Sequence, residues 1–169
     1  MKNTKKMMAA LLSLAMVSAL APMSVFADTT VNQDTTPKTG QTEVTYDVAA
    51  KYTVTIPAGV TLSDTAEVTK DITADAGVML ESGQTIVVKL TGATYTESGS
   101  TFNATNGTSV ANYTISVDGT KKAIGDTVAT FTTKTTAQSA TLTFSAATGA
   151  TLAGEHTETL TFTISTPTT

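Results

Sequence analysis

Few side chains in this chain could do chemistry, and its only histidine is the first to consider. His156 lies in residues 154–158 (GEHTE), just before the last apolar stretch. A nucleophilic mechanism that uses a histidine base would have to be built on this residue. In a strand, His156 and Glu158 share one face with the apolar residues that follow them. We therefore expect His156 at the rim of a buried strand face, exposed or half-buried and without a catalytic role.

Paired acids and metal ligands are equally sparse. Glu155 and Glu158 are three residues apart and point to opposite faces of a strand, so they cannot face each other across a sugar. The chain has no cysteine and one histidine, which excludes the usual zinc site. The acids between Asp64 and Asp75 offer oxygen ligands, but their spacing matches no EF-hand loop. We expect no enzymatic activity, no cofactor and no metal, and leave open only a weak calcium site between Asp64 and Asp75.

Tyrosines are the remaining candidates for contact with a ligand. Tyr46, Tyr52 and Tyr113 alternate in phase with aliphatic residues, so we expect most of them in the core. Tyr95 lies in a loop of Gly, Ser and Thr residues and is the one ring that we expect to be exposed. Because an exposed ring can stack on a sugar, a carbohydrate-binding module is one function that the sequence leaves open.

The elements that would position these side chains are strands, because apolar residues alternate with period two from Thr42 onward. Turn sequences separate the apolar sets, and Asn106-Gly107 and Asp118-Gly119 are the most hairpin-like. Threonine, which favours strands, makes up 39 of the 142 residues from Asp28 onward. The apolar sets are Val44/Tyr46/Val48, Tyr52/Val54/Ile56, Val68/Ile72, Ile86/Val88/Leu90, Tyr113/Ile115/Val117, Val128/Phe131, Leu142/Phe144 and Leu160/Phe162/Ile164.

This pattern predicts an all-β fold. About eight to ten short strands at these intervals indicate an antiparallel two-sheet sandwich of immunoglobulin-like, Greek key type. We expect one such domain over residues 42–166, followed by a short tail over 167–169. Residues 28–41 are polar and hold a single aliphatic residue, so they predict a flexible leader.

The start of the chain predicts export. Residues 1–6 carry three lysines, residues 7–26 carry no charge, and small side chains precede Asp28. This is typical of a signal peptide over 1–27, cleaved between Ala27 and Asp28. Cleavage would change the formal net charge from −4 to −7 and leave a chain without arginine, which excludes a basic surface for nucleic acid. We expect a secreted protein associated with the cell envelope, with no membrane span after cleavage.

Two stretches resemble known surface proteins. Residues 153–164 (AGEHTETLTFTI) resemble the closing strand of WxL-type cell-surface domains of Gram-positive bacteria, with Phe162-Thr163-Ile164 where that family carries Trp-x-Leu. Residues 52–62 are similar to the opening strand of small secreted β-sandwich proteins of Firmicutes, including fibre-forming ones. The chain has no tryptophan, so the resemblance implies a cell-surface β-domain but carries over no wall-binding residue.

The sequence therefore predicts a non-enzymatic structural or adhesion module at the cell surface. Its partner would be a cell-wall polymer, another surface protein or a further copy of itself. One alternative is a fibre subunit, in which residues 28–48, with Val44, Tyr46 and Val48, add as a strand to the open sheet edge of a neighbour. The other alternative is the carbohydrate-binding module, with Tyr95 as the contact.

Overall fold

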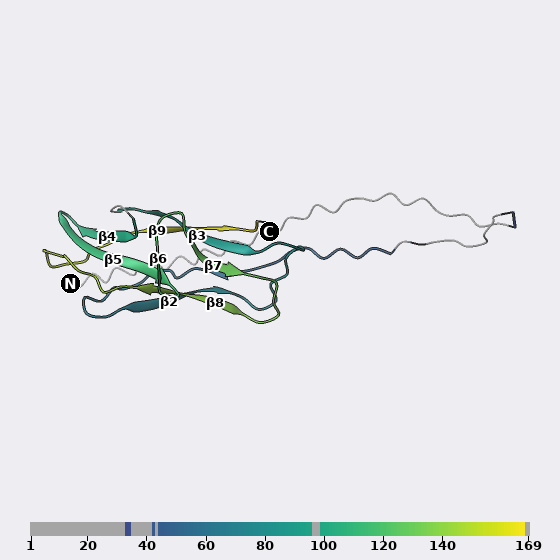
Figure 1. Cartoon of the computed structure of the whole chain (residues 1–169), viewed down its shortest axis with the longest axis horizontal. Helices are drawn as coiled ribbons and strands as arrows, with labels where there is room; N and C mark the ends of the chain where they lie inside the picture. The colour runs from purple at the N-terminus through teal and green to yellow at the C-terminus, as the bar shows by residue number, and fades with distance from the viewer. Residues whose placement is uncertain (1–32, 35–41, 43, 96–98, 168–169) are drawn as a thin grey trace, which may run out of the picture.

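The computed structural model of the chain describes residues 33–34, 42, 44–95 and 99–167, and the regular elements in these residues are all strands (Figure 1). The predicted cleavage site at Ala27 and Asp28, and nearly all of the leader, lie outside the described residues. No helix long and apolar enough to cross a membrane occurs in the described part. The strands are β1 (Val54–Thr55), β2 (Val68–Ala74), β3 (Ile86–Ala93), β4 (Thr101–Asn106), β5 (Ser109–Val117), β6 (Thr120–Lys122), β7 (Thr127–Phe131), β8 (Gln138–Phe144) and β9 (Leu160–Ser165).

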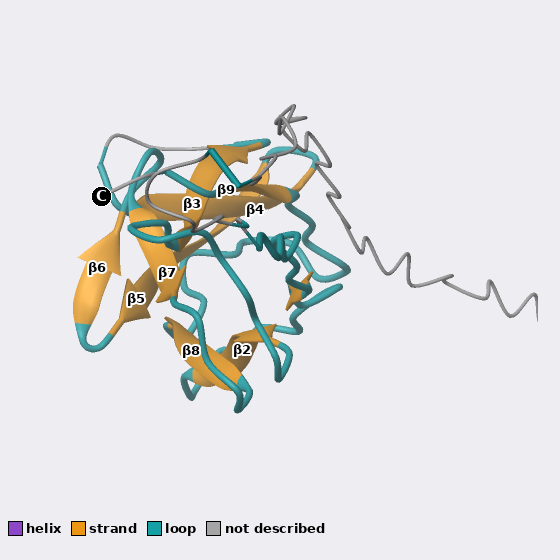
Figure 2. Cartoon of the chain, turned by 90° about the vertical axis from the view of Figure 1, so that its right-hand side faces the viewer, coloured by secondary structure: helices purple, strands orange, loops and turns teal. Residues whose placement is uncertain are grey.

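The strands form two antiparallel sheets. One has the order β1-β2-β8-β5-β4, with β6 also paired to β5, and the other has the order β7-β3-β9. Figure 2 shows the two layers, with β3 and β9 in one and β2 and β8 in the other. Thr105 of β4 and Thr157 exchange two backbone hydrogen bonds of 3.0 Å, which link the sheets just before β9. The predicted all-β, two-sheet sandwich is confirmed, while its immunoglobulin-like detail stays a prediction.

The core lies between the sheets and follows the predicted alternation. The inward side chains of β3, which are Ile86, Val88 and Leu90, are all 0% exposed. From the other sheet, Ile72 and Leu142 meet them at 0% and 1% exposed. Burial of this kind supplies the main stabilising term of a sandwich without disulfides.

β9 is paired along one edge only. Among the described residues β3 is its one strand partner, with Leu90 opposite Phe162 and Val88 opposite Ile164. Yet Leu160, Phe162 and Ile164 are only half-buried, whereas Leu90 and Val88 are fully buried. Because opposite residues of a ladder share one face, the difference arises from the missing neighbour on the other side of β9.

The hairpin turns are close to those predicted. Asp118 and Gly119 have φ values of 49° and 74°, as a type I′ turn between β5 and β6 requires. The turn between β4 and β5 is centred on Gly107 and Thr108, because Asn106 pairs with Ser109. It therefore lies one residue later than the predicted Asn106-Gly107 centre.

The segment before β1 differs from the prediction. Residues 44–50, called the arm below, form no strand, and the arm extends away from the sandwich (Figure 1). Val44 is 88% exposed, Tyr46 90% and Val48 45%. The predicted strand over 44–48 is wrong for this structure, because no segment of the described chain lies beside the arm to pair with it. The expected burial of Tyr46 is wrong for the same reason, whereas Tyr113 is buried and Tyr52 half-buried.

Candidate functional site

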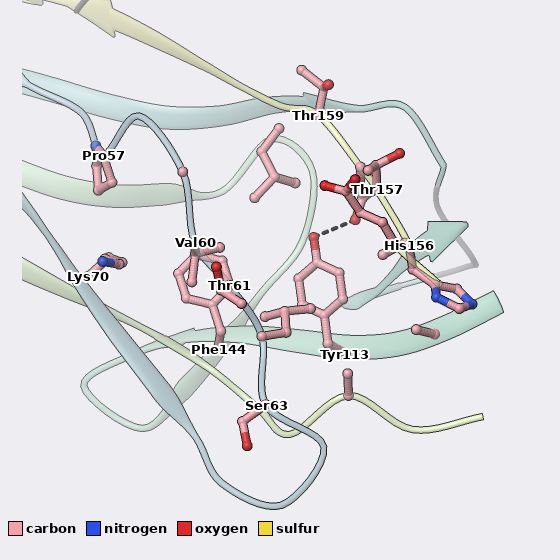
Figure 3. Close-up of a pocket in the computed structure, with 18 of the residues that line it drawn as sticks. Pro57, Val60, Thr61, Ser63, Lys70, Tyr113, Phe144, His156, Thr157 and Thr159 are labelled. Carbon is pink, nitrogen blue, oxygen red and sulfur yellow. Dashed lines mark hydrogen bonds between the residues drawn. The ribbon is translucent and has the colours of Figure 1, made fainter. Parts of the chain in front are cut away.

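An open cavity of about 810 Å³ lies where the two sheets separate. Residues 56–64, which follow β1, line one side of it, and residues 154–160, which lead into β9, line the other. In Figure 3, Pro57 and Val60 lie on the first side and Thr157 and Thr159 on the second, with the rings of Tyr113 and Phe144 between them. The cavity is of the size that holds a small ligand or a few side chains.

A tyrosine and a glutamate meet in this cavity. The hydroxyl of Tyr113 on β5 donates a hydrogen bond to Oε2 of Glu158, drawn as the dashed line in Figure 3. The Tyr113 ring packs against Phe102 and Phe144, with ring centroids 5.7 Å and 6.2 Å apart. The alternation in the sequence correctly predicts that Glu158 lies on the inward face. Its partner Tyr113 lies 45 residues earlier in the chain, so no local pattern could predict this contact.

Burial dominates the electrostatics of this pair. It raises the pKa of Glu158, although the bond from Tyr113 and the nearby backbone amides of Tyr95 and Asn103 oppose the shift. Burial, followed by the effect of Glu158, raises the pKa of Tyr113 far above its ordinary value, so this hydroxyl stays protonated. Oε1 of Glu158 is buried and has no hydrogen-bond partner among the described residues. This oxygen is closed to solvent, so the Glu158 carboxylate is enclosed by the fold and held by Tyr113.

A second polar cluster holds the loop before β9. Ser109 is 1% exposed, and its Oγ accepts hydrogen bonds from the backbone N–H of Thr151 at 2.8 Å and of Leu152 at 3.1 Å. The same Oγ lies 2.8 Å from Nε2 of His156, and Nδ1 of His156 lies 3.2 Å from the carbonyl of Gly154. Because the Ser109 hydroxyl already accepts two backbone N–H groups, its own proton can be donated to Nε2, while Nδ1 faces the carbonyl acceptor of Gly154. Ser109 is thus a buried anchor of the loop, and sequence reasoning missed it.

The other predicted candidates do not gather into a site. Tyr95 is 48% exposed and follows the end of β3. Asp64, Glu67, Asp71 and Asp75 are all exposed, and no group of three or more possible metal ligands occurs in the part of the chain that the structure describes.

Half-buried apolar residues line both sides of the cavity. Val60 and Leu62 contribute from the side after β1, and Leu160 and Phe162 contribute from β9. The arm has a complementary feature, which is an exposed apolar alternation that no strand of the described residues pairs with. Both segments carry apolar residues at every second position, and these are exposed on the arm and half-buried on β9.

Comparison of the chain with protein-family models, with curated proteins and with solved structures gave no match. The cavity, the free edge of β9 and the arm therefore carry the functional proposal.

Proposed function

We propose that this chain is a non-enzymatic structural subunit of the extracellular surface whose copies join by strand addition. The arm of one copy enters the cavity of the next copy and pairs with the free edge of β9. The observation that carries this proposal is the half-burial of Phe162 and Ile164 on an edge strand whose register partners on β3, Leu90 and Val88, are fully buried.

The backbone of β9 supports the proposal. An edge strand presents N–H and C=O groups that can pair with another extended chain. Strand addition uses these groups for affinity and uses pockets for alternate side chains for specificity. β9 has both features, since its outer edge has no strand partner in the described residues and the cavity lies beside its inward side chains.

The side chains of the arm supply the driving force. Val44, Tyr46 and Val48 lie on one face of an extended chain and are exposed in the free subunit. Burying one such side chain fully contributes about 1.5–3 kcal/mol. Ordering the arm costs about 1–2 kcal/mol per residue, so the gain must come from filling the cavity and pairing the edge together. The association is therefore expected to depend on protein concentration.

The geometry favours a neighbouring copy over the same copy as acceptor. Lys51 exchanges two backbone hydrogen bonds with Met79, at 2.8 and 2.9 Å, which fixes where the arm leaves the sandwich. From there the arm runs outward (Figure 1). Because arm and cavity are different surfaces of one copy, the contact is heterologous, and copies can join head to tail.

The test compares the expected mature chain, from Asp28, with a variant that lacks residues 28–48. The described core begins at Val54, so the deletion removes none of its residues. Light scattering and electron microscopy should show concentration-dependent linear assemblies of the mature chain and monomers of the deletion variant. Strict monomers of the mature chain at high concentration would contradict the proposal, as would assembly that persists after the deletion.

The surface location has its own test. Fractionation of the producing cells should recover the protein with washed cell walls. Protein found only in the medium would contradict attachment to the cell surface, although it would leave self-assembly standing.

A further inference from the structure

We infer that the arm docks parallel to β9 and that Asp47 of the arm pairs there with Lys89 of the acceptor copy. This inference rests on the proposed function and names the direction and the register of the added strand. It assigns a role to the one charged residue of the arm and to the one charged residue of the sheet β7-β3-β9.

Lys89 is exposed on the outer face of the acceptor sheet. It lies on β3 between Val88 and Leu90, which are fully buried, so its side chain points away from the core. Its register partner on β9 is Thr163, which is also exposed. The strands β7, β3 and β9 carry no acidic residue. The free edge of β9 therefore lies one strand away from an accessible cation that no acid of its own sheet neutralises.

The arm carries the complementary charge on the corresponding face. Val44, Tyr46 and Val48 lie on one face of the extended arm, and Thr45 and Asp47 lie on the other. Asp47 is exposed in the free subunit. When the apolar face of the arm turns toward the cavity, Asp47 turns toward the outer face of the sheet, which is the face that carries Lys89.

The apolar contacts alone do not determine the direction of the arm. Two directions bring the three apolar residues of the arm level with those of β9, and both place Tyr46 beside Phe162 with a valine on each side. Parallel pairing is slightly less stable per residue than antiparallel pairing. A parallel arm therefore needs a further contribution from its polar face.

The polar face distinguishes the two directions. In the parallel direction Asp47 lies beside Thr163, whose neighbour on β3 is Lys89. In the antiparallel direction Asp47 lies beside Thr161, whose neighbour on β3 is Gly92 and has no side chain. Adjacent strands are about 4.8 Å apart, so the long side chain of Lys89 can reach across a threonine to an acid on the added strand. Only the parallel direction joins the two charges.

The first test is a charge-reversal cycle in the mature chain, read as the concentration at which half of the protein is assembled in sedimentation velocity. Asp47→Lys and Lys89→Glu should each weaken assembly by about fivefold at low salt, because each replaces an exposed attraction with a repulsion. The double variant restores opposite charges and should assemble within about twofold of the unmodified chain. High salt should reduce the effect of each single variant, since the pair is exposed.

Lys121→Glu is the matched control, because it makes the same change of charge at an exposed position on β6 in the other sheet. It should change assembly by the same factor whether residue 47 is Asp or Lys. Asp47 and Lys89 are exposed in the free subunit, so their variants should leave the thermal unfolding of the dilute monomer nearly unchanged.

The second test reads the direction by disulfide crosslinking, which is selective because the chain has no cysteine. Thr45→Cys combined with Thr161→Cys should link copies into multimers under mild oxidation, since these positions are neighbours in the parallel direction. Thr45→Cys combined with Thr163→Cys should link copies poorly. In that pair the two positions are offset by two residues, and Cα atoms more than about 7 Å apart cannot be bridged without backbone movement.

The outcomes separate this inference from the proposed function. Direction and register would be wrong if the double charge variant did not recover assembly, if the single variants had effects below twofold, or if Thr163→Cys crosslinked better than Thr161→Cys. Strand addition would still stand in these cases if the deletion of 28–48 abolished assembly. If the mature chain never assembled, both proposals would be wrong.

Discussion

A lysine scan of two neighbouring arm positions tests whether the alternation of the arm determines assembly. Val44→Lys and Thr45→Lys introduce the same residue and the same change of charge at adjacent sites. In strand addition Val44 faces the cavity and Thr45 faces solvent. Only Val44→Lys should therefore disturb the docked state.

The size of the effect follows from exposure. Val44 is 88% exposed in the free subunit, so nearly the whole burial term of a valine is gained on docking. Full burial of such a side chain contributes about 1.5–3 kcal/mol. Loss of about 2 kcal/mol of this term corresponds to about 30-fold weaker association. Thr45→Lys keeps the inward face intact and should stay within about threefold of the unmodified chain, the effect of a surface change of about 0.5 kcal/mol.

Sedimentation velocity over a concentration series measures both variants, and thermal unfolding of the dilute monomer serves as the folding control. Neither substitution should change the unfolding temperature, because both residues are exposed in the monomer. If both lysines weakened assembly equally, the arm would not dock with a defined face. If Thr45→Lys had the larger effect, the proposed register would be wrong by one residue.

Three further predictions concern the subunit itself. Burial raises the pKa of Glu158 in the folded chain above its value in the unfolded chain. The folded chain is therefore most stable when Glu158 is protonated in both states, below the ordinary carboxyl pKa, and it loses stability as pH rises through the raised value. Glu158→Gln should therefore raise the unfolding temperature at neutral pH, with a gain that shrinks at about pH 4, measured by thermal unfolding. Ser109→Ala removes a buried hydroxyl and leaves the backbone amides of Thr151 and Leu152 without this acceptor, so it should destabilise the fold by about 1 kcal/mol in urea unfolding, whereas the exposed Ser139→Ala on β8 should have little effect. Phe102→Ala removes a side chain that is 0% exposed and should lower the free energy of unfolding of the monomer by about 3–5 kcal/mol. Phe162→Ala removes a half-buried side chain, so it should destabilise the monomer less than Phe102→Ala does but weaken assembly more.

Much of the fold was predictable from local pattern. β3 and β9 show plain alternation of large apolar residues, and their strands lie where the alternation predicted them. β4 and the start of β5 were missed, because Phe102 stands alone among polar residues and Ala111 is too small to mark a buried face in sequence. β6 has three residues, which is too short for any period to show.

The site was less predictable, for two physical reasons. Contacts such as Tyr113 with Glu158 and Ser109 with His156 join residues 45 and 47 positions apart, and only the completed sheets bring them together. The alternation of Val44, Tyr46 and Val48 is a local signal, but it tells which face is apolar and says nothing of what covers that face. A period of two therefore predicted a strand where the subunit alone has an exposed arm.

An open strand edge can pair with any extended chain, and the pattern around the edge of β9 restricts that pairing. Its outward residues Thr161 and Thr163 are polar and exposed, so a partner strand gains apolar contacts only on the inward face. A slip of one residue in the docked arm would turn Tyr46 outward and bring Asp47 to the apolar face. The alternation thus selects the register as well as the partner. Since each added copy brings one new arm and one new free edge, docking of this kind can continue from copy to copy along a line.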